Sequence, residues 1–506
     1  PPLGFAALTD APTGWGMFEP SVDAAAARVA FSTTFDFAGR NADGNFEVFV
    51  LEPGTGAIVQ LTDSPFGVGN FLPRLTPDGS AVVFRSAWDY VGANPAKKFQ
   101  LFEVDVATGA IDQLTVNAEA QNVDDPALSG DGRYVVFVSN SNPTGQNSDL
   151  SYELFRLLRT TEAVQQLTLT TGTANDQPSV DLDGDRAAFR AAHDFDGSNP
   201  EKNPEIWLWR EGLGIVAVTA TPAGAESASP ALDAAGLRVA FLSRHDLAGA
   251  GTGTTENVWV ADLAGPRPGF QLASVPGALA VLPPAISPDG RYVYYETQRD
   301  QLGLNPDGNR ELYRYDTLLG VLEQATDTLG GVATTQLSAR AADNYLAFPA
   351  GLPEVLALRS EHGLDGPNPG GNLDLLLAGP PAPPPLDYGD GIAGHAGVPS
   401  LAAEKAVLGE PLELAVENAI GVATFGALFL GHAPDALPTG LGGDLLVAPD
   451  LTLLLAVSGG RSGVTIAVPL DATLLGGVLY AQAFVLDPSA PEGIASTPGL
   501  EVRAGF

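Results

Sequence analysis

An internal repeat of about 53 residues runs through the first three quarters of this chain. An apolar, strand-like segment ends in an aromatic residue at seven regularly spaced positions: Phe31, Phe84, Phe137, Phe189, Phe241, Tyr295 and Phe348. The successive spacings are 53, 53, 52, 52, 54 and 53 residues. A period near this length, with several strand signals in each repeat, is typical of a β-propeller in which each repeat forms one blade. Seven repeats therefore predict an all-β protein with a seven-bladed propeller.

The composition excludes several kinds of chemistry and of partner. The chain has no cysteine, which rules out disulfides, thiolate metal sites and cysteine nucleophiles. Its 60 acidic and 25 basic residues give a net charge of −35, which would repel a phosphate backbone, so we expect no nucleic-acid partner. Since no apolar run approaches the roughly 18 residues of a transmembrane helix, we also expect no membrane span.

The second repeat shows the order of signals within one blade. A Thr-Pro-Asp-Gly turn at 76–79 precedes an apolar strand at 81–84, a second strand covers 100–104, and a Thr-Gly turn at 108–109 leads to Gln113-Leu114-Thr115. Asp-Gly and Thr-Gly supply the positive φ angles that tight hairpins need. This order resembles the TolB-like propeller repeat, a WD40-like repeat, over roughly residues 5–380. The resemblance implies a binding protein located outside the cytoplasm more often than an enzyme.

The two ends of the repeat region are complementary. The segment Ala7-Leu8-Thr9 matches the closing Gln60-Leu61-Thr62 strand of the first repeat, whereas the seventh repeat stops without such a strand. We therefore expect the N-terminal strand to complete the last blade. A blade built from both ends of the propeller closes the ring and protects edges that would otherwise be open.

Acidic loops follow the aromatic strand in several repeats and are candidate calcium sites. Calcium prefers oxygen ligands, and the first and sixth repeats present them at close spacing. The candidate ligands are Asp36, Asn41, Asp43, Asn45, Glu47, Asp300, Asn305, Asp307, Asn309 and Glu311. The alternative is that these side chains accept bonds from nearby backbone amides as Asx turns, and this alternative is favoured. No other cofactor is expected.

Three histidines, His193, His245 and His362, lie beside carboxylates near one position of repeats four, five and seven. Imidazoles next to carboxylates can ligate a transition metal. However, the same position holds Phe35 and Trp88 in the first two repeats, and the fourth and seventh blades of a ring lie far apart. We therefore interpret the histidines as variable residues at the edges of loops.

A second domain follows the proline-rich segment. The sequence predicts a propeller over 1–380, a stiff linker over 381–387 and a β-sandwich over 388–506, because short apolar runs there alternate with Gly, Pro and Asp turns. The phrases Tyr388-Gly389-Asp390-Gly391 and Leu408-Gly409-Glu410-Pro411 resemble a C-terminal domain of secreted planctomycete and myxobacterial proteins. That resemblance implies an extracellular or cell-surface location, with the periplasm as the alternative.

No catalytic signature stands out in the sequence. A Gly-x-Ser-x-Gly nucleophile elbow is absent, and the acidic residues are too many to nominate a catalytic pair. The sequence therefore predicts no enzyme activity but an extracellular binding or scaffold protein, which uses the propeller rim to contact proteins, further copies of itself or polysaccharide. The alternative is an extracellular carbohydrate-active enzyme, a lyase or glycosidase, with carboxylates at the centre of the propeller.

Overall fold

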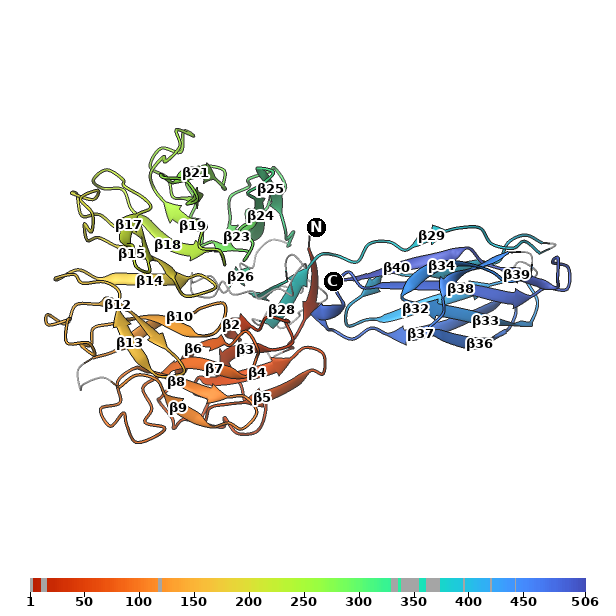
Figure 1. Cartoon of the computed structure of the whole chain (residues 1–506), viewed down its shortest axis with the longest axis horizontal. Coiled ribbons are helices and arrows are strands. Elements are labelled where there is room, and N and C mark those ends of the chain that lie inside the picture. The colour runs from red at the N-terminus through yellow and green to blue at the C-terminus, as the bar shows by residue number, and fades with distance from the viewer. Residues whose placement is uncertain are drawn as a thin grey trace. The chain divides into compact units, whose positions relative to one another are not determined.

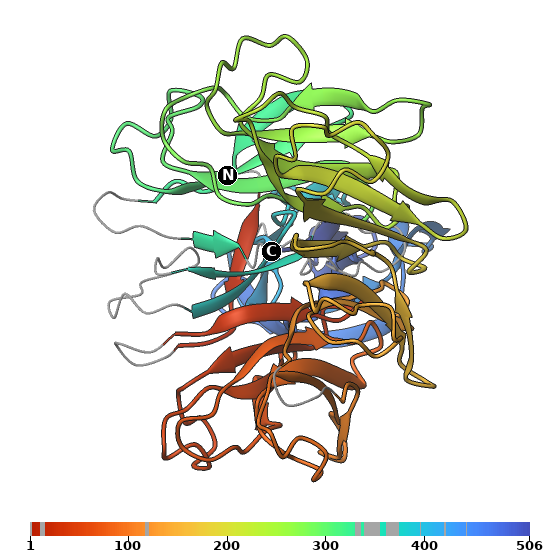
Figure 2. The same cartoon turned by 90° about the vertical axis from the view of Figure 1, so that its left-hand side faces the viewer.

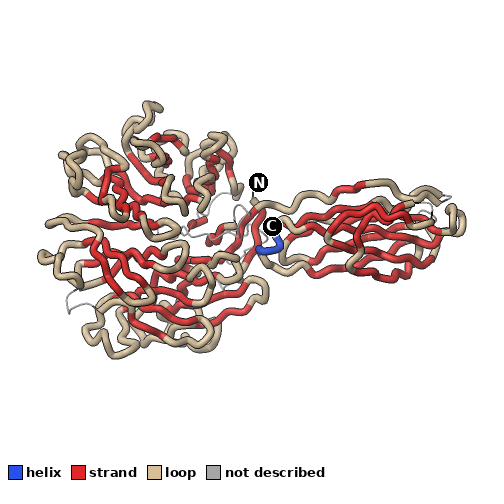
Figure 3. Tube along the Cα trace, viewed as in Figure 1, coloured by secondary structure: helices blue, strands red, loops and turns tan. Residues whose placement is uncertain are grey.

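The computed structural model describes residues 3–10, 16–116, 121–328, 335–337, 355–360, 374–394, 396–418, 421–441 and 443–506. The chain divides into two compact units, Pro1–Ala378 and Gly379–Phe506. Almost all regular structure in the described residues is β-strand, and a single turn of 3-10 helix lies at Ala472–Leu474 (Figure 3). No helix in this described part is long and apolar enough to cross a membrane.

The first unit contains seven four-stranded antiparallel sheets, the blades (Figure 1). Blade 1 contains β2 (Phe18–Val22), β3 (Val29–Thr33), β4 (Glu47–Glu52) and β5 (Ala57–Gln60). Blade 2 contains β6 (Asn70–Leu75), β7 (Ala81–Ser86), β8 (Gln100–Asp105) and β9 (Ile111–Gln113). Blade 3 contains β10 (Val123–Leu128), β11 (Tyr134–Ser139), β12 (Glu153–Leu158) and β13 (Ala163–Gln166).

The remaining blades repeat this pattern. Blade 4 contains β14 (Asn175–Val180), β15 (Arg186–Ala191), β16 (Glu205–Arg210) and β17 (Gly214–Ala217). Blade 5 contains β18 (Ser227–Leu232), β19 (Arg238–Ser243), β20 (Asn257–Asp262) and β21 (Gly269–Leu272). Blade 6 contains β22 (Ala285–Ile286), β23 (Tyr292–Thr297), β24 (Glu311–Asp316) and β25 (Val321–Gln324). Blade 7 contains β26 (Thr335–Leu337), β27 (Leu356–Ser360), β28 (Asp374–Gly379) and β1 (Gly4–Ala7).

The aromatic residues that mark the repeat form the blade cores. In each of the first six blades the marker on the second strand pairs with another aromatic side chain on the third strand: Phe31 with Phe49, Phe84 with Phe102, Phe137 with Phe155, Phe189 with Trp207, Phe241 with Trp259 and Tyr295 with Tyr313. All twelve are at most 1% exposed. Aromatic pairs of this kind stabilise a sheet beyond the area that they bury. The seventh marker, Phe348, lies outside the described residues.

The N-terminal strand closes the ring, as the sequence predicts. Strand β1 is the outermost strand of blade 7 and pairs with β28 (Figure 2). Beyond it, the Leu8 amide donates to the Leu375 carbonyl at 2.8 Å, and the Thr9 hydroxyl donates to the Asp374 carboxylate at 3.1 Å. The predicted all-β fold, a seven-bladed propeller followed by a β-sandwich, is confirmed.

Antiparallel strands give the propeller two different faces. The tight turns between the first and second strands and between the third and fourth strands lie at one end, here called the turn face. The long loops between the second and third strands, and the connections to the next blade, lie at the other end, the loop face. First strands of neighbouring blades contact one another, as with β2 and β6, β10 and β14, and β14 and β18. These first strands therefore surround the axis of the ring, and the fourth strands lie outside (Figure 1).

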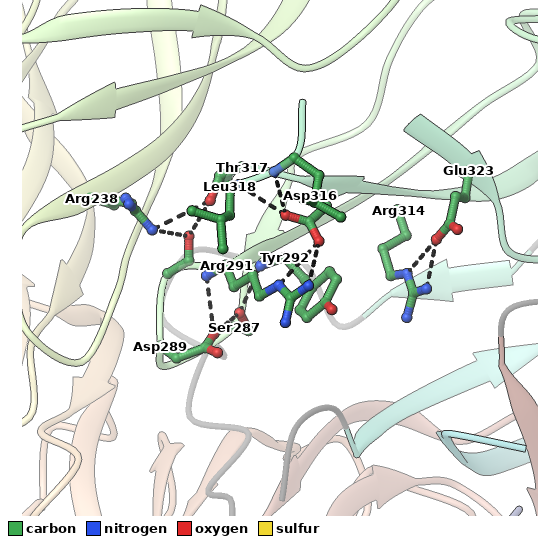
Figure 4. Close-up of polar contacts among 12 residues, drawn as sticks. Arg238, Ser287, Asp289, Arg291, Tyr292, Arg314, Asp316, Thr317, Leu318 and Glu323 are labelled. Atoms are coloured by element: carbon green, nitrogen blue, oxygen red, sulfur yellow. Dashed lines mark hydrogen bonds and ion pairs between the residues drawn. The ribbon is translucent and has the colours of Figure 1, made fainter. Parts of the chain in front are cut away.

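At the turn face, an arginine that lies beside a buried aspartate of its own blade donates hydrogen bonds to the next blade, as Figure 4 shows for Arg238 and Thr317. The Asp233 carboxylate, 4% exposed, accepts the Leu237 and Arg238 amides at 2.7 and 3.0 Å. The Arg238 guanidinium donates to the Gly290 carbonyl of the next blade at 3.1 Å. Equivalent groups join blade 1 to blade 2 and blade 4 to blade 5: Asp23, Arg28 and Gly79, and Asp181, Arg186 and Gly236. Burial raises the pKa of Asp23 and Asp233, and that of Asp181 to about 6.

The second unit is a β-sandwich. One sheet has the order β29 (Leu386–Tyr388), β40 (Gly499–Gly505), β38 (Val478–Leu486), β33 (Thr424–Gly431) and β36 (Leu451–Val457), with β31 (Ala406–Val407) and β39 (Ile494–Ser496) attached to it. The other contains β30 (Ser400–Ala403), β32 (Pro411–Glu417) and β37 (Arg461–Ala467). A hairpin of β34 (Ala433–Pro438) and β35 (Asp444–Ala448) forms a third, two-stranded sheet. Side chains from both main sheets share one core, which includes Leu414, Leu428 and Val485.

The proline-rich segment is tied to the second unit. The Ala382 amide donates to the Phe506 carbonyl at 3.1 Å, and the Phe506 amide donates to the Pro380 carbonyl at 2.9 Å. The start of the segment predicted as a stiff linker therefore hydrogen-bonds with Phe506, which directly follows β40.

Candidate active site at the loop face

A strained bulge recurs in the first strands of five consecutive blades. The pairing of the first with the second strand shifts by one residue in blades 1 to 5. At each shift a residue other than glycine adopts a positive φ of 45–55° and is followed by proline: Glu19, Leu72, Asp125, Gln177 and Ser229. Such conformations cost of order 1–3 kcal/mol each and concentrate at functional sites, as bulges do. The five bulges surround the axis near the loop face.

Side chains of one blade hold the bulge of the next. The Glu19 carboxylate accepts the Leu72 amide at 2.6 Å, and the Gln177 side-chain carbonyl accepts the Ser229 amide at 2.8 Å. A bulge leaves an amide without its partner in the ladder, and these bonds between blades satisfy it. The bulges of blades 2 and 5 are therefore fixed in position by the preceding blade.

Aspartates beside the bulges of blades 3 and 4 form ion pairs with arginines of the second strands. Arg190 binds Asp176 with two bonds, of 2.8 and 2.7 Å, within blade 4. Arg85 of blade 2 lies 3.5 Å from Asp124 of blade 3. Both aspartate side chains stay partly exposed, at 31% for Asp176 and 40% for Asp124. Carboxylates placed in this way are oriented by protein groups and still reach solvent.

The charged groups continue into blade 5. Arg244 lies 3.2 Å from Glu226 and 3.4 Å from Glu256. The hydrogen bond with Asp176 raises the pKa of Arg190, and the negative charges of Glu226 and Asp125 add to the effect. The group thus contains five carboxylates, Asp124, Asp125, Asp176, Glu226 and Glu256, and three guanidinium groups, Arg85, Arg190 and Arg244, so its net charge is negative.

Aromatic side chains continue the row on the side of blades 1 and 2. Ring centroids are 5.5 Å apart for Phe18 and Phe46, 5.3 Å for Phe46 and Phe71, and 6.4 Å for Phe71 and Phe99. Arg85 lies over the Phe99 ring at 3.7 Å and links this row to the ionic group. All four rings are partly exposed. We call the four phenylalanines and the eight charged residues together the axial strip.

The loop residues predicted to bind calcium in the first repeat hold their own loop. The Asp36 carboxylate accepts the Arg40 and Asn41 amides at 2.8 and 3.1 Å, which forms the Asx-type turn of the alternative interpretation. The Asn41 side chain donates to the Asn45 carbonyl at 3.0 Å, and the Asn45 side chain donates to the Ser64 carbonyl at 2.8 Å. Loop hydrogen bonds thus account for the placement of these side chains.

The glutamates of the same motif lie beneath the loops. Glu47 is 1% exposed and accepts bonds from the Thr62 hydroxyl, the Ser64 amide and hydroxyl, and the Asn70 side chain. Burial raises its pKa. Glu311 repeats this arrangement with Thr326 and Thr328.

The sixth repeat keeps most of the same loop bonds. Asp300 accepts the Asn305 amide, Asn305 donates to the Asn309 carbonyl, and Asn309 donates to Thr328. Asp43 and Asp307 are exposed at the loop tips.

The two candidate histidines that the structure describes, His193 and His245, make separate contacts. His193 packs against the Phe195 ring at 4.7 Å, the His245 amide donates to the Ser243 hydroxyl at 3.2 Å, and His362 lies outside the described residues. The described residues contain no group of three or more His, Asp or Glu side chains placed to hold a metal ion. Calcium at the acidic loops stays a prediction.

The axial strip was missed in the sequence, although one signal marks it. Proline follows the bulge residue at positions 20, 73, 126, 178 and 230, which repeats the period of the aromatic markers. Proline in a strand is confined to edges and bulges, so a periodic proline indicates an edge strand. This signal locates the first strands and the two residues before each proline, among them Asp124 and Asp176.

Comparison with known proteins shows the fold and no family. No family model matches the chain, and no curated protein matches it in sequence. Among solved structures, an oligogalacturonate lyase from Vibrio parahaemolyticus is similar with a TM-score of 0.50 at 13% identity, over 74% of this chain and 96% of that one. A prolyl endopeptidase has a TM-score of 0.47 at 14% identity, over 81% and 55%. An acylaminoacyl peptidase from Pyrococcus horikoshii has a TM-score of 0.43 at 13% identity, over 81% and 59%.

The similarity to the lyase corrects the functional prediction. The sequence analysis predicts a non-catalytic binding or scaffold protein and no enzyme, whereas the oligogalacturonate lyase of similar fold is an enzyme. The prediction of a non-catalytic protein is therefore contradicted, and its enzymatic alternative is favoured. The physical reason for the error is that acid–base catalysis by carboxylates leaves no short sequence motif, so the absence of a nucleophile elbow could not exclude it.

Proposed function

We propose that this protein is a carbohydrate-active enzyme whose substrate binds along the axial strip. The observation that carries the proposal is the ring of five strained bulges, which sets partly exposed carboxylates of different blades beside arginines near the loop-face end of the axis. Strain of this kind persists only where the surrounding structure enforces it, and the bonds between blades do so here.

In this proposal Asp124 and Asp176 carry the acid–base chemistry. Glycoside hydrolysis uses two carboxyl groups on either side of the scissile bond, one to protonate the leaving oxygen and one to activate water or attack the sugar. The two guanidinium groups, Arg85 and Arg190, hold these carboxylates in place and can donate to sugar hydroxyls. The four phenylalanines offer flat apolar faces against which the C–H face of a sugar ring can pack.

The charge of the strip favours a neutral polysaccharide over a polyuronate. Five carboxylates face three guanidinium groups within the strip, and the whole chain carries −35. An anionic chain would meet repulsion both at a distance and at the site. The oligogalacturonate lyase of similar fold is named for a substrate of that anionic kind. The activity proposed here, hydrolysis of a neutral glycan, therefore differs from the activity in that name.

We also propose that the enzyme works outside the cell. The proposal rests on the TolB-like order of turns and strands in the propeller and on the phrases of the second unit that resemble domains of secreted proteins. Fractionation of the native host, with detection of the protein in the medium, the cell surface or the periplasm, tests it. Recovery only from the cytoplasm would overturn it.

A panel of purified polysaccharides tests the catalytic proposal. The protein should release reducing ends from at least one neutral glycan without forming an unsaturated sugar, whereas a lyase acting on polyuronate would produce ultraviolet absorbance from the new double bond. Asp176→Asn should lower kcat/KM by about 100- to 10,000-fold, the usual contribution of a general acid or base. Activity on neither class, or activity unchanged in both Asp176→Asn and Asp124→Asn, would overturn the proposal.

Asp183→Asn is the matched control. Asp183 belongs to the same blade as Asp176 and is exposed, but it lies in the turn after β14, on the turn face. The same chemical change there should leave kcat/KM within about twofold, since a surface substitution away from the site alters little.

A further inference from the structure

The side of the sandwich between β36 and β37 is open. Strand β36 ends one sheet, β37 ends the other, and no further strand pairs with either outer edge among the described residues. The two strands follow each other in the chain and are joined by a tight turn, in which Ser458 and Arg461 form an isolated β-bridge. Beyond this turn they belong to different sheets. Between them lies a pocket of about 480 Å³ lined mainly by aliphatic side chains, including Leu451, Leu453, Val464 and Ile466. The core is therefore incompletely covered along this side.

The edge strand lacks the features that keep exposed edges from pairing. Natural edge strands carry charges, proline or bulges. Neither β36 nor its neighbour β33 contains a charged residue or a proline, and all seven residues of β36 pair regularly with β33. Leu454 is 89% exposed, Phe425 on β33 is 68% exposed, and Leu451 is 50% exposed. Pairing at this edge therefore places no like charges of β33 or β36 opposite each other.

Charged groups at the two ends of β36 are complementary under twofold symmetry. Asp450, next to His432 at 2.6 Å, precedes the strand, and Arg461, 3.5 Å from Glu417, follows its turn. If two copies of β36 pair antiparallel about Leu454, Asp450 of one copy lies opposite Ser458 of the other copy. Within each copy, Ser458 forms a β-bridge with Arg461, so this pairing brings Asp450 of one copy close to Arg461 of the other. Each end then sets a negative group beside a positive one. Parallel pairing would instead set like charges together.

We propose that β36 is the pairing edge of a homodimer, in which a second copy of this chain adds its own β36 antiparallel and the two open sides close each other. A seven-residue strand is about 24 Å long, and a two-sheet edge with its margins is about 20 Å wide, so each copy buries roughly 500 Å². The total of about 1,000 Å² lies at the lower limit for a specific interface. The dimer therefore forms reversibly, and not as an obligate pair.

Sedimentation velocity of the full chain between about 1 and 100 µM, the range where a reversible dimer dissociates, tests the proposal. The dimer fraction should rise with concentration. Leu454→Lys should raise the dissociation constant at least tenfold, because it places two charges opposite each other at the twofold axis. Leu213→Lys, at a propeller position 72% exposed, is the matched control and should leave the dissociation constant unchanged. A protein monomeric at every concentration, or a dimer indifferent to Leu454→Lys, would overturn the proposal.

Cysteine variants locate the contact independently of affinity, and charge-reversal variants test the direction of pairing. The chain has no cysteine, so Leu454→Cys should form a disulfide-linked dimer under mild oxidation, and Leu213→Cys should form far less. Arg461→Glu should weaken the dimer, and adding Asp450→Lys should restore it, since the pair is then reversed rather than removed. Equal cross-linking at both cysteine positions, or no recovery in the double charge variant, would contradict antiparallel pairing.

Discussion

Replacing Gly290 with alanine tests the contact that joins neighbouring blades at the turn face. Gly290 has a φ of +70°, and a Cβ atom there would lie 2.7 Å from the Asp233 Oδ2 atom and 3.1 Å from the Arg238 Cδ atom of the preceding blade. Gly303, in the same blade, has a φ of +72° and nothing within 4 Å of an added Cβ. The two alanines therefore suffer the same backbone strain, and only one of them collides with the neighbouring blade.

The expected losses follow from these distances. Alanine in the left-handed region costs about 1 kcal/mol, so Gly303→Ala should lower the free energy of unfolding by about that amount. At Gly290 the Asp233 carboxylate must also move, although it accepts two backbone amides, and overpacking of a buried contact adds about 2 kcal/mol. With an unfolding entropy of roughly 0.8 kcal/mol/K for about 378 residues, the melting temperature should fall by about 4 °C for Gly290→Ala and about 1 °C for Gly303→Ala.

A double-mutant cycle with Asp233→Ala isolates the collision. Removing the carboxylate should abolish the extra cost at Gly290, giving a coupling of about 2 kcal/mol, and should leave the cost at Gly303 unchanged. Thermal and urea denaturation monitored by circular dichroism measure all the variants. Equal losses for the two glycine variants, or a cycle in which Asp233→Ala and Gly290→Ala are additive, would refute the reasoning.

Three other properties can be measured on the same preparation. Because burial raises the pKa of Asp181 to about 6, above the ordinary value of about 3.9, the stability that its protonation contributes is fully present below pH 4 and is lost as the pH rises through about 6. Asp181→Asn should therefore gain about 1–2 kcal/mol relative to the parent between pH 5 and 7, after allowance for partial solvent screening, and Asp183→Asn should not. Deletion of residues 1–10 should lower the melting temperature, because blade 7 loses its outermost strand, and an unchanged value would contradict that role. Chelation of calcium should leave the melting temperature unchanged, because hydrogen bonds hold the acidic loops, whereas a rise on adding calcium that disappears in Asp43→Ala with Asp307→Ala would show binding.

The blade architecture could be predicted because the residues that recur in the repeat are those that form the blade cores and the tight turns. The markers from Phe31 to Tyr295 are the buried second-strand aromatics, and the Asp-Gly turns sit where the strands reverse. Closure by the N-terminus could be predicted for the same reason, since Leu8-Thr9 repeats the Leu-Thr pair that ends each of the first three blades. A periodic signal of this kind reports local structure and nearest-neighbour packing, which are the same in each repeat.

The candidate site could not be predicted in the same way. Asp124 and Asp176 come from different blades. Each lies at a bulge in the first strand of its blade, and no single residue type predicts such a bulge from the sequence. Glu47 and Glu311 show the opposite case. Their sequence suggested a ligand, but Thr62 and Thr326, each just beyond the fourth strand of its blade, donate a hydrogen bond to these buried carboxylates.

Closure by β1 also determines when, during synthesis of the chain, the propeller can finish folding. The Thr9 hydroxyl donates to Asp374 and accepts the Leu375 amide, and these bonds join residues separated by 365 and 366 positions. At about 5–20 residues per second, a ribosome takes roughly 20–70 seconds to produce the second partner after the first. During that interval six blades can form, but β1 has no sheet to join and blade 1 has no neighbour on one side. A nascent chain of this kind is vulnerable at both ends until its last blade emerges, and its final folding step can begin only when synthesis of the propeller is complete.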